Sequence, residues 1–232
     1  MRRHPHLGEP RPSGWVRVDM HSHTMFSGDS TTTLDEIAGA VVDAGIDVLC
    51  VTDHNSVDGA RRLQRELEAS GACRVDVGEE VRTHTGEIIG LFLTDRVPFG
   101  STAADTARQI RDQGGVVYVP HPFDPMRRNL TEASLVELAE AGLVDAIEAH
   151  NSKTSLASLN ERARAFGALH DLALGAGSDA HVPLAIGSGY VEMPDFDGPQ
   201  DFLDKLRMGR VVGHHWDEPR PWSARIIPSM TE

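Results

Sequence analysis

The chain of 232 residues is 40% apolar and 25% charged, a composition that is ordinary for a globular protein. Its formal charge of −13 argues against a broad basic surface for nucleic-acid binding. No apolar run is long enough to span a bilayer, so we do not expect a membrane-embedded protein.

The first 14 residues are rich in Arg, Pro and His and contain no apolar stretch of the kind found in secretory signals. We expect residues 1–14 to form a flexible lead-in and residues 15–232 to form a single domain. The two cysteines, Cys50 and Cys73, lie in or beside apolar segments, which indicates buried, reduced thiols and a cytoplasmic location.

Along the domain, short apolar runs alternate with amphipathic helical patterns. The runs predict strands at residues 15–20, 46–52, 74–77, 87–93, 116–120, 146–149 and 172–175, with two later candidates at 190–193 and 210–213. The amphipathic patterns predict helices at residues 33–44, 56–69, 102–113, 132–141, 155–166 and 201–208. Strands and helices that alternate in this way are typical of βαβ units and a largely parallel sheet.

Local signals refine this prediction. Thr33 and Glu36 have the spacing of a capping box at the start of the first helix, and Gly45 stands where that helix needs a left-handed residue. No helical pattern separates residues 74–81 from 87–93, so we expect a hairpin or tight turn through 83–86. We therefore predict an α/β fold, a distorted (β/α)7 barrel with its active site at the C-terminal ends of the strands.

The first predicted strand ends in a pattern suited to metal binding. Because side chains alternate along a strand, Asp19, His21 and His23 share one face. Two neutral imidazoles on one face can converge on a single metal ion. The alternative is a pair of solvated or hydrogen-bonded histidines, which is common for an isolated motif of this length.

The remaining strand ends favour the metal interpretation. Nearly every apolar run is followed by His, Asp or Glu: Asp53 and His54, Glu79 and Glu80, His121, Glu148 with His150 and Asn151, and Asp179 with His181. In a parallel barrel the C-terminal strand ends meet at one face. So many ligand types exceed the needs of one tetrahedral zinc and predict two or three divalent ions: zinc, manganese or iron.

The order of these motifs resembles the PHP (polymerase and histidinol phosphatase) domain family. The resemblance rests on D-x-H-x-H, T-D-H, a Glu after Gly, H-P and G-S-D-x-H, and it spans residues 16–187. It implies a distorted (β/α)7 barrel that holds up to three metals. It also implies hydrolysis of phosphomonoesters or phosphodiesters, in which a metal-bound hydroxide attacks phosphorus.

The resemblance assigns metal ligands to positions of this sequence. It implies that one metal is shared by His21, His23, Asp179 and a bridging Glu80, which is chosen over Glu79 because the family ligand precedes an apolar residue. His121 and Glu80 would hold a second metal, while His54 and His181 would hold a third, and Asp29 fits a further ligand position.

Two parts of this assignment stay open. Many members of the family carry another His in the strand after the bridging Glu, and this chain has none there, so His84 or water would have to replace it. Asn151 matches a family position near the metals, and its neighbour His150 is the alternative for the side chain that points inward.

Other polar residues receive supporting roles. We expect Asp19 and Asp53 to orient imidazoles, with proton transfer as an alternative role for Asp53. Arg82, Arg127 and Arg128 are candidate phosphate contacts, or else ordinary solvated arginines. The histidines that we expect at the surface are His4, His6, His214 and His215, and we expect His170 at the bottom of a helix or strand, away from the metals.

The leading expectation is therefore a metal-dependent phosphoesterase that acts on a small anionic phosphorylated substrate, with a nucleotide or oligonucleotide end included. One alternative is an amidohydrolase-like enzyme that cleaves C–N or C–O bonds. Such enzymes typically use a bridging modified lysine, and we expect neither Lys153 nor Lys205 at a suitable strand end. The other alternative is a PHP module that binds metal without catalysis.

Overall fold

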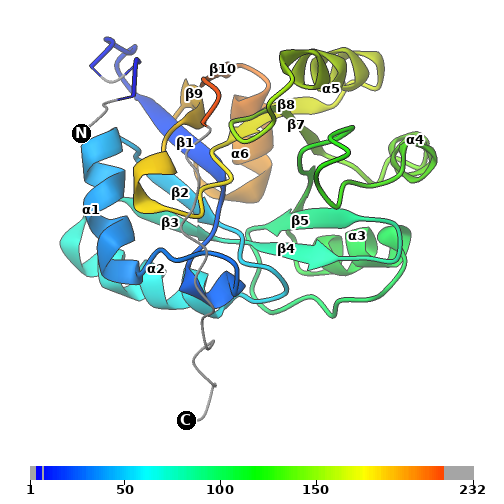
Figure 1. Ribbon diagram of the computed structural model, residues 1–232, viewed down its shortest axis with the longest axis horizontal. Helices are drawn as coiled ribbons and strands as arrows, with labels where there is room; N and C mark the ends of the chain where they lie inside the picture. The colour runs from blue at the N-terminus through cyan, green and yellow to red at the C-terminus, as the bar shows by residue number, and fades with distance from the viewer. Residues whose placement is uncertain (1–3, 7, 217–232) are drawn as a thin grey trace.

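In a computed structural model that describes residues 4–6 and 8–216, the chain forms two five-stranded sheets flanked by helices (Figure 1). The first sheet has the order β10-β9-β1-β2-β3 and the second β4-β5-β6-β7-β8. The strands are β1 Trp15–Ser22, β2 Val48–Val51, β3 Arg74–Val77, β4 Glu79–Arg82, β5 Glu87–Leu91, β6 Val116–Val119, β7 Ala146–Asn151, β8 Ala173–Gly177, β9 Gly189–Pro194 and β10 Arg210–Gly213. The end of the predicted domain, residues 217–232, lies outside the described residues, as do residues 1–3 and 7 of the lead-in.

Both sheets are mixed, so the expectation of a largely parallel sheet is wrong. The pairs β1/β2, β2/β3, β6/β7 and β7/β8 are parallel, whereas β1/β9, β9/β10, β4/β5 and β5/β6 are antiparallel. A parallel connection needs a crossover of about a dozen residues or more. The connection between β4 and β5 is much shorter, and the predicted hairpin there is confirmed.

The two sheets contact each other through two isolated parallel bridges. Ser22, at the end of the interior strand β1, pairs with Ala180 beyond the edge strand β8, and His54, just beyond the interior strand β2, pairs with Glu80 in the edge strand β4. Within the described residues these contacts do not extend into ladders, so the α/β class is confirmed but a continuously closed barrel is not seen. Register shifts in β1 between Asp19 and Ser22, and in β7 between Glu148 and His150, bend the strand ends that meet there.

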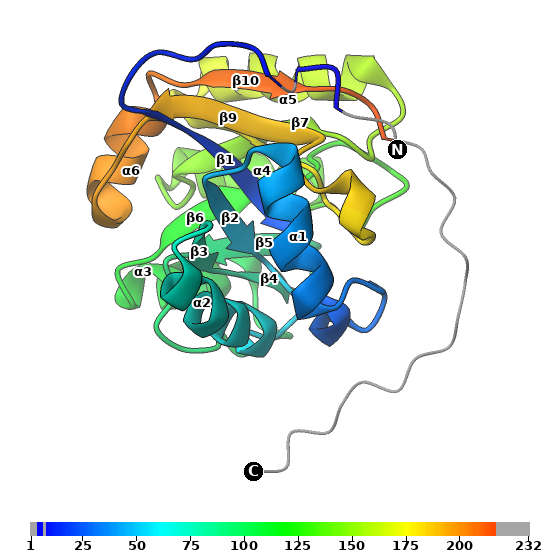
Figure 2. The same cartoon turned by 90° about the vertical axis from the view of Figure 1, so that its left-hand side faces the viewer.

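The helices cover the outside of the sheets. They are α1 Leu34–Ala44, α2 Asp58–Ser70, α3 Ala103–Asp112, α4 Glu132–Glu140, α5 Ala157–Leu169 and α6 Gly198–Leu206, with short 3-10 turns η1 Met25–Ser27 and η2 Pro183–Ala185. Helices α1 and α2 lie side by side on one flank, as two views at right angles show (Figure 2). In the part of the chain that the structure describes, no helix is both long and apolar enough to cross a membrane.

Local sequence signals set the ends of α1 as predicted. The Thr33 hydroxyl accepts from the Glu36 amide while the Glu36 carboxylate accepts from the Thr33 amide, so the capping box is confirmed. Gly45 adopts the left-handed conformation, with φ of 64°. The described part of the lead-in also touches the fold, because Arg11 pairs with Asp47. Both cysteines are free and buried.

Candidate metal centre

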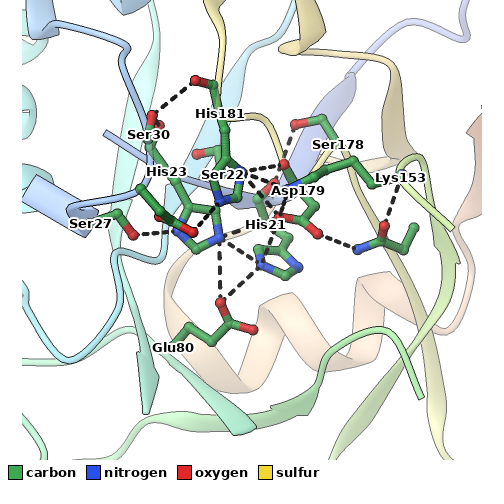
Figure 3. A network of polar contacts seen from close by, with 12 residues as sticks. His21, Ser22, His23, Ser27, Ser30, Glu80, Lys153, Ser178, Asp179 and His181 are labelled. Carbon is green, nitrogen blue, oxygen red and sulfur yellow. Dashed lines mark hydrogen bonds and ion pairs between the residues drawn. The ribbon is translucent and has the colours of Figure 1, made fainter. Parts of the chain in front are cut away.

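The end of β1 places two imidazoles against each other in the interior. His21 and His23 are almost fully buried, and their Nε2 atoms lie 3.0 Å apart. The same Nε2 atoms lie 3.5 and 3.4 Å from Oε2 of Glu80, and 3.8 and 3.5 Å from Oδ1 of Asp179 (Figure 3). Such a convergence of lone pairs and carboxylates in the interior calls for a positive charge among them.

The loop after β8 brings Asp179 to this point. The Asp179 amide donates to the His21 carbonyl at 2.8 Å, and Asp179 itself adopts a left-handed conformation with φ of 50°. Asp19 fixes the loop, because its carboxylate accepts from the amides of Ser178 and Gly187 at 2.9 and 3.0 Å. Burial raises the pKa of Asp19 to about 6. Asp19 therefore accepts hydrogen bonds from backbone amides of this loop, which corrects the expectation that it orients an imidazole.

Glu80 lies at the centre of the groups. Its Oε1 is 3.0 Å from Nε2 of His121 and its Oε2 is 3.1 Å from Nδ1 of His54. Burial alone would raise the pKa of Glu80, but the adjacent His21 and His54 hold it well below its usual range. Glu79 points elsewhere, since its carboxylate accepts from the Val97 amide at 2.7 Å.

A second group of ligand types lies nearer the surface. Asp29 follows the turn η1, and its Oδ2 lies 3.1 Å from Nε2 of His181 and 3.5 Å from Nε2 of His54. Burial lowers the pKa of His54, but the carboxylates of Glu80 and Asp29 outweigh burial and raise it to about 11. Asp29 has a strongly lowered pKa, because its contacts with His181 and His54 outweigh its own burial.

The strand β7 settles which of two neighbours faces the centre. Asn151 donates to Glu148 and Asp179 at 3.0 and 3.3 Å, so its side chain points inward. His150 instead lies beside Ser152 and Asn160, at 3.4 and 3.5 Å. The register shift in β7 causes this exchange of faces.

His84 does not fill the place suggested for it. It is exposed, and among the described residues it belongs to none of the groups of three or more ligand types. It lies in the turn between β4 and β5, where its amide donates to the Ser101 carbonyl at 3.0 Å.

Two supporting residues were missed from the sequence. Glu148 is fully buried, with one oxygen 3.1 Å from Nδ1 of His21 and the other accepting from the His121 amide at 2.6 Å. Ser27 Oγ lies 2.8 Å from Nδ1 of His23. These contacts orient the two imidazoles, the role expected of the aspartates. The signal for Glu148 was present, because it stands at a strand end among other ligand types.

Lys153 was also missed, and the expectation that it lies at no suitable strand end is wrong. It follows β7 by two residues, and its Nζ lies 3.1 Å from Oδ1 of Asp179 and 2.9 Å from Nδ1 of His181 (Figure 3). This cation and the imidazole of His21 hold the pKa of Asp179 well below its usual value despite burial.

Comparison with known proteins assigns this architecture to a family. Residues 19–140 match the model of the PHP domain, and residues 157–211 match a PHP-associated model. The chain belongs to the PHP family. An uncharacterized protein of Methanocaldococcus jannaschii, MJ0417, is 30% identical over 202 residues, which cover 83% of this chain and 80% of the relative.

Solved structures share the PHP fold at low identity. One is a two-domain protein from Bacteroides vulgatus described as containing a predicted PHP-like metal-dependent phosphoesterase. It has a TM-score of 0.68 and 19% identity, over 92% of this chain and 70% of that chain. Another is described as an amidohydrolase from Chromobacterium violaceum with bound sulfate and no metal. It has a TM-score of 0.57 and 15% identity, over 72% of this chain and 88% of that chain. These likenesses show the fold alone.

Asp53 of this PHP domain supports the turn after β1. Its two oxygens accept from the amide and the hydroxyl of Thr24, both at 2.7 Å. Burial raises the pKa of Asp53 to about 7. The carboxylate therefore positions the residue next to His23, which corrects the expectation that it orients an imidazole. Asp53 is not among the residues that line the cleft, so its contacts do not support proton transfer to a substrate.

A cleft of about 430 Å³ in this PHP domain is lined by six of the expected ligands, Asp29, His54, Glu80, His121, Asp179 and His181, but not by His21 or His23. Arg82, Arg127 and Arg128 also line this cleft. Arg127 reaches deepest, with its Nε 4.0 Å from Oδ2 of Asp179, while Arg82 and Arg128 are exposed. The three candidate phosphate contacts therefore share one cavity with the candidate ligands.

The donor set of the PHP domain fits divalent cations. Four overlapping groups have ligand atoms within 4.8 Å of one another: His23, Asp29, His54 and His181; His21, Glu80 and His121; His21, His23 and Asp179; and His54, Glu80 and Glu87. Among the described residues the buried Nδ1 of His121 has no hydrogen-bond partner, and Oε2 of Glu80 and Nδ1 of His54 lie 3.1 Å apart without the geometry of a hydrogen bond. Buried polar atoms in such a state are rare unless an ion or water satisfies them. Mixed imidazole and carboxylate sites accept zinc, iron and manganese.

Proposed function

We propose that this PHP domain is a metal-dependent hydrolase of phosphate esters that uses two or three divalent cations. The observation that carries the proposal is one cleft, in which members of each of the overlapping His and carboxylate groups line the same space as three arginines. Bound there, divalent cations would polarise a phosphoryl oxygen and acidify a water molecule.

Residues of the chain would hold the cations and bind the substrate. Glu80 contacts His21, His54 and His121, so its carboxylate would hold divalent cations together with these imidazoles. Arg127 and Arg128 line the cleft, and their planar guanidinium groups suit the phosphoryl oxygens of a substrate bound there. The proposed substrate is a small phosphorylated molecule, a nucleotide or oligonucleotide end included, because the cleft is of small-ligand size.

We also interpret the two sheets as a distorted (β/α)7 barrel. The interpretation is supported by the two bridges between the sheets, which join the end of β1 to the end of β8 and the end of β2 to β4. It explains why ligands at the end of β1, just after β3 and just after β8 lie together.

The test is a screen of phosphate esters with the purified protein. The protein is stripped with a chelator and reloaded with zinc, manganese or iron(II) in turn, and phosphate release is followed from nucleotides, sugar phosphates and phosphodiesters. We expect turnover that is lost in His21→Ala and retained in His170→Ala, a matched histidine that packs on Phe166 outside the centre. No release from any ester with any of the three metals would refute the proposal.

The second candidate is hydrolysis of a C–N or C–O bond, and Lys153 is the observation that favours it. Its amine lies at Asp179 and His181, although Glu80 occupies the bridging place. A panel of amides and lactones in the same screen distinguishes the two. Turnover there, with phosphate esters untouched, would establish this function in place of the first.

A further inference from the structure

Glu87, the first residue of β5, is a buried carboxylate with no ordinary partner. Only 5% of the residue is exposed, yet it lines the cleft. Its nearest charged contact is Nδ1 of His54, at 3.9 Å, beyond hydrogen-bonding distance. Among the described residues no side-chain or backbone donor forms a hydrogen bond with this carboxylate. A buried carboxylate without donors is costly unless a cation accompanies it.

The hairpin fixes where Glu87 stands. The turn before it is closed by the amide and hydroxyl of Thr83, which both donate to the Gly86 carbonyl at 2.8 Å. In the β4/β5 ladder Glu87 pairs directly with Arg82. Opposite charges at paired positions normally interact across the strands. No ion pair joins the two in the described structure, although both residues line the cleft.

The Glu87 carboxylate instead approaches a second carboxylate. One oxygen each of Glu80 and Glu87 and a ring nitrogen of His54 lie within 4.8 Å of one another. Within the described structure the Oε2 atom of Glu80 and the Nδ1 atom of His54 lie 3.1 Å apart without the geometry of a hydrogen bond, although Glu80 is 1% exposed. Two carboxylates so close together repel each other unless a positive charge lies between them.

We propose that Glu87 is a ligand of a divalent cation that it shares with Glu80 and His54. The inference rests on the proposed metal centre and adds a residue to it that the sequence did not indicate. Two carboxylates and one imidazole form a harder donor set than the pair of imidazoles with Asp179 at the end of β1. The site at Glu87 therefore accepts manganese more readily, relative to zinc, than the β1 site does.

Metal binding by the full chain tests this assignment without reference to activity. Metal-free protein is titrated with manganese, which is counted by electron paramagnetic resonance, and with zinc in competition with a chromophoric chelator. We expect Glu87→Gln to bind one fewer manganese ion, or to bind the weakest one at least about tenfold more weakly. Glu87→His should bind the ion but shift its preference toward zinc by about tenfold.

Glu79→Gln is the matched control. Glu79 is another buried carboxylate on this hairpin, but it accepts from the Val97 amide, a role that a glutamine oxygen retains. The control should bind metal like the unaltered protein. If Glu87→Gln does not fold, Glu87→Asp replaces it, because it keeps the charge but withdraws it from the ion.

The outcomes distinguish an error in the proposed metal centre from an error in the role of Glu87 alone. Unaltered protein that binds no divalent cation would refute the metal centre and, with it, the proposed function. Unaltered protein that binds metal, with the same number and affinity of ions in Glu87→Gln, would refute only the role of Glu87.

Discussion

Replacing Glu148 with glutamine is expected to weaken metal binding although the side chain keeps its shape. The Glu148 carboxylate faces several donors: Nδ1 of His21 at 3.1 Å, the His121 amide at 2.6 Å and the Asn151 side-chain amide at 3.0 Å. A glutamine offers one oxygen and one NH2 group, so at least one donor must face another donor.

The expected loss of metal affinity depends on which contact of Glu148 the glutamine fails to make. If the NH2 group faces His21, the imidazole must carry its proton on Nε2, the atom that lies among His23, Glu80 and Asp179, and that nitrogen can no longer coordinate. Loss of a carboxylate that orients a ligand typically weakens metal binding by about 10- to 100-fold, which corresponds to about 1.4–2.7 kcal/mol.

Two measurements check this prediction. Zinc affinity is obtained by competition with a chromophoric chelator, and nitrogen–proton correlation spectra report the tautomer of His21. Glu192→Gln is the control, since this buried carboxylate pairs with Arg17 and Arg210 away from the centre and its loss should cost stability alone. Unchanged zinc affinity in Glu148→Gln, or an equal loss in Glu192→Gln, would refute the reasoning.

Three further predictions concern pH and packing. The pKa of His54 is raised to about 11 in the metal-free protein, so cation binding must displace its proton. Metal affinity, measured by chelator competition, should therefore rise by up to about tenfold per pH unit between pH 6 and 8. A metal affinity independent of pH would contradict this prediction. Burial raises the pKa of Asp76 from 3.8 to about 7, so ionisation destabilises the fold above pH 7 and has no such effect below pH 4. Denaturant unfolding should therefore show Asp76→Asn stabilised by up to about 4 kcal/mol at pH 8 and by little at pH 4, and an equal effect at both values would count against the shift. Gly177→Ala should lower both the melting temperature and the metal affinity, because the added Cβ would lie 2.3 Å from Cβ of His21. The control Gly39→Ala, whose Cβ would meet no atom within 4 Å, should stabilise helix α1 by about 1 kcal/mol. Equal melting temperatures of the two variants would refute this packing argument.

The sequence predicted the position of the site because its signal is local. Alternation along β1 places His21 and His23 on one face, and strand ends that pack side by side must bring their next residues together. The residues that converge, Glu80, His121 and Asp179 among them, each follow an apolar run directly or lie within a few residues of its end. The order of the motifs then indicated the family, and the family resemblance implied which of these residues are ligands.

What the sequence could not predict depends on register and on side-chain reach. The shift in β7 exchanges His150 for Asn151, and nothing in the local pattern marks an extra residue in a strand. Glu87 stands at the start of its strand, not at the C-terminal end, and joins the group only because β5 runs antiparallel to β4. Lys153 reaches Asp179 across the space between two strand ends, a contact that only the folded structure can show.

The positions of the two bridges between the sheets imply that metal binding at the centre would also stabilise the contact between the sheets. Ser22 with Ala180 and His54 with Glu80 are the sites where the sheets join, and candidate ligands stand at or beside each of them. A cation bound there would act as a cross-link between parts of the chain that are distant in sequence and would close both joins at once. Native-state hydrogen exchange would reveal this coupling, since the amides of His23 and Asn55, which donate across the joins, should open first in the chelated protein and last in the loaded one.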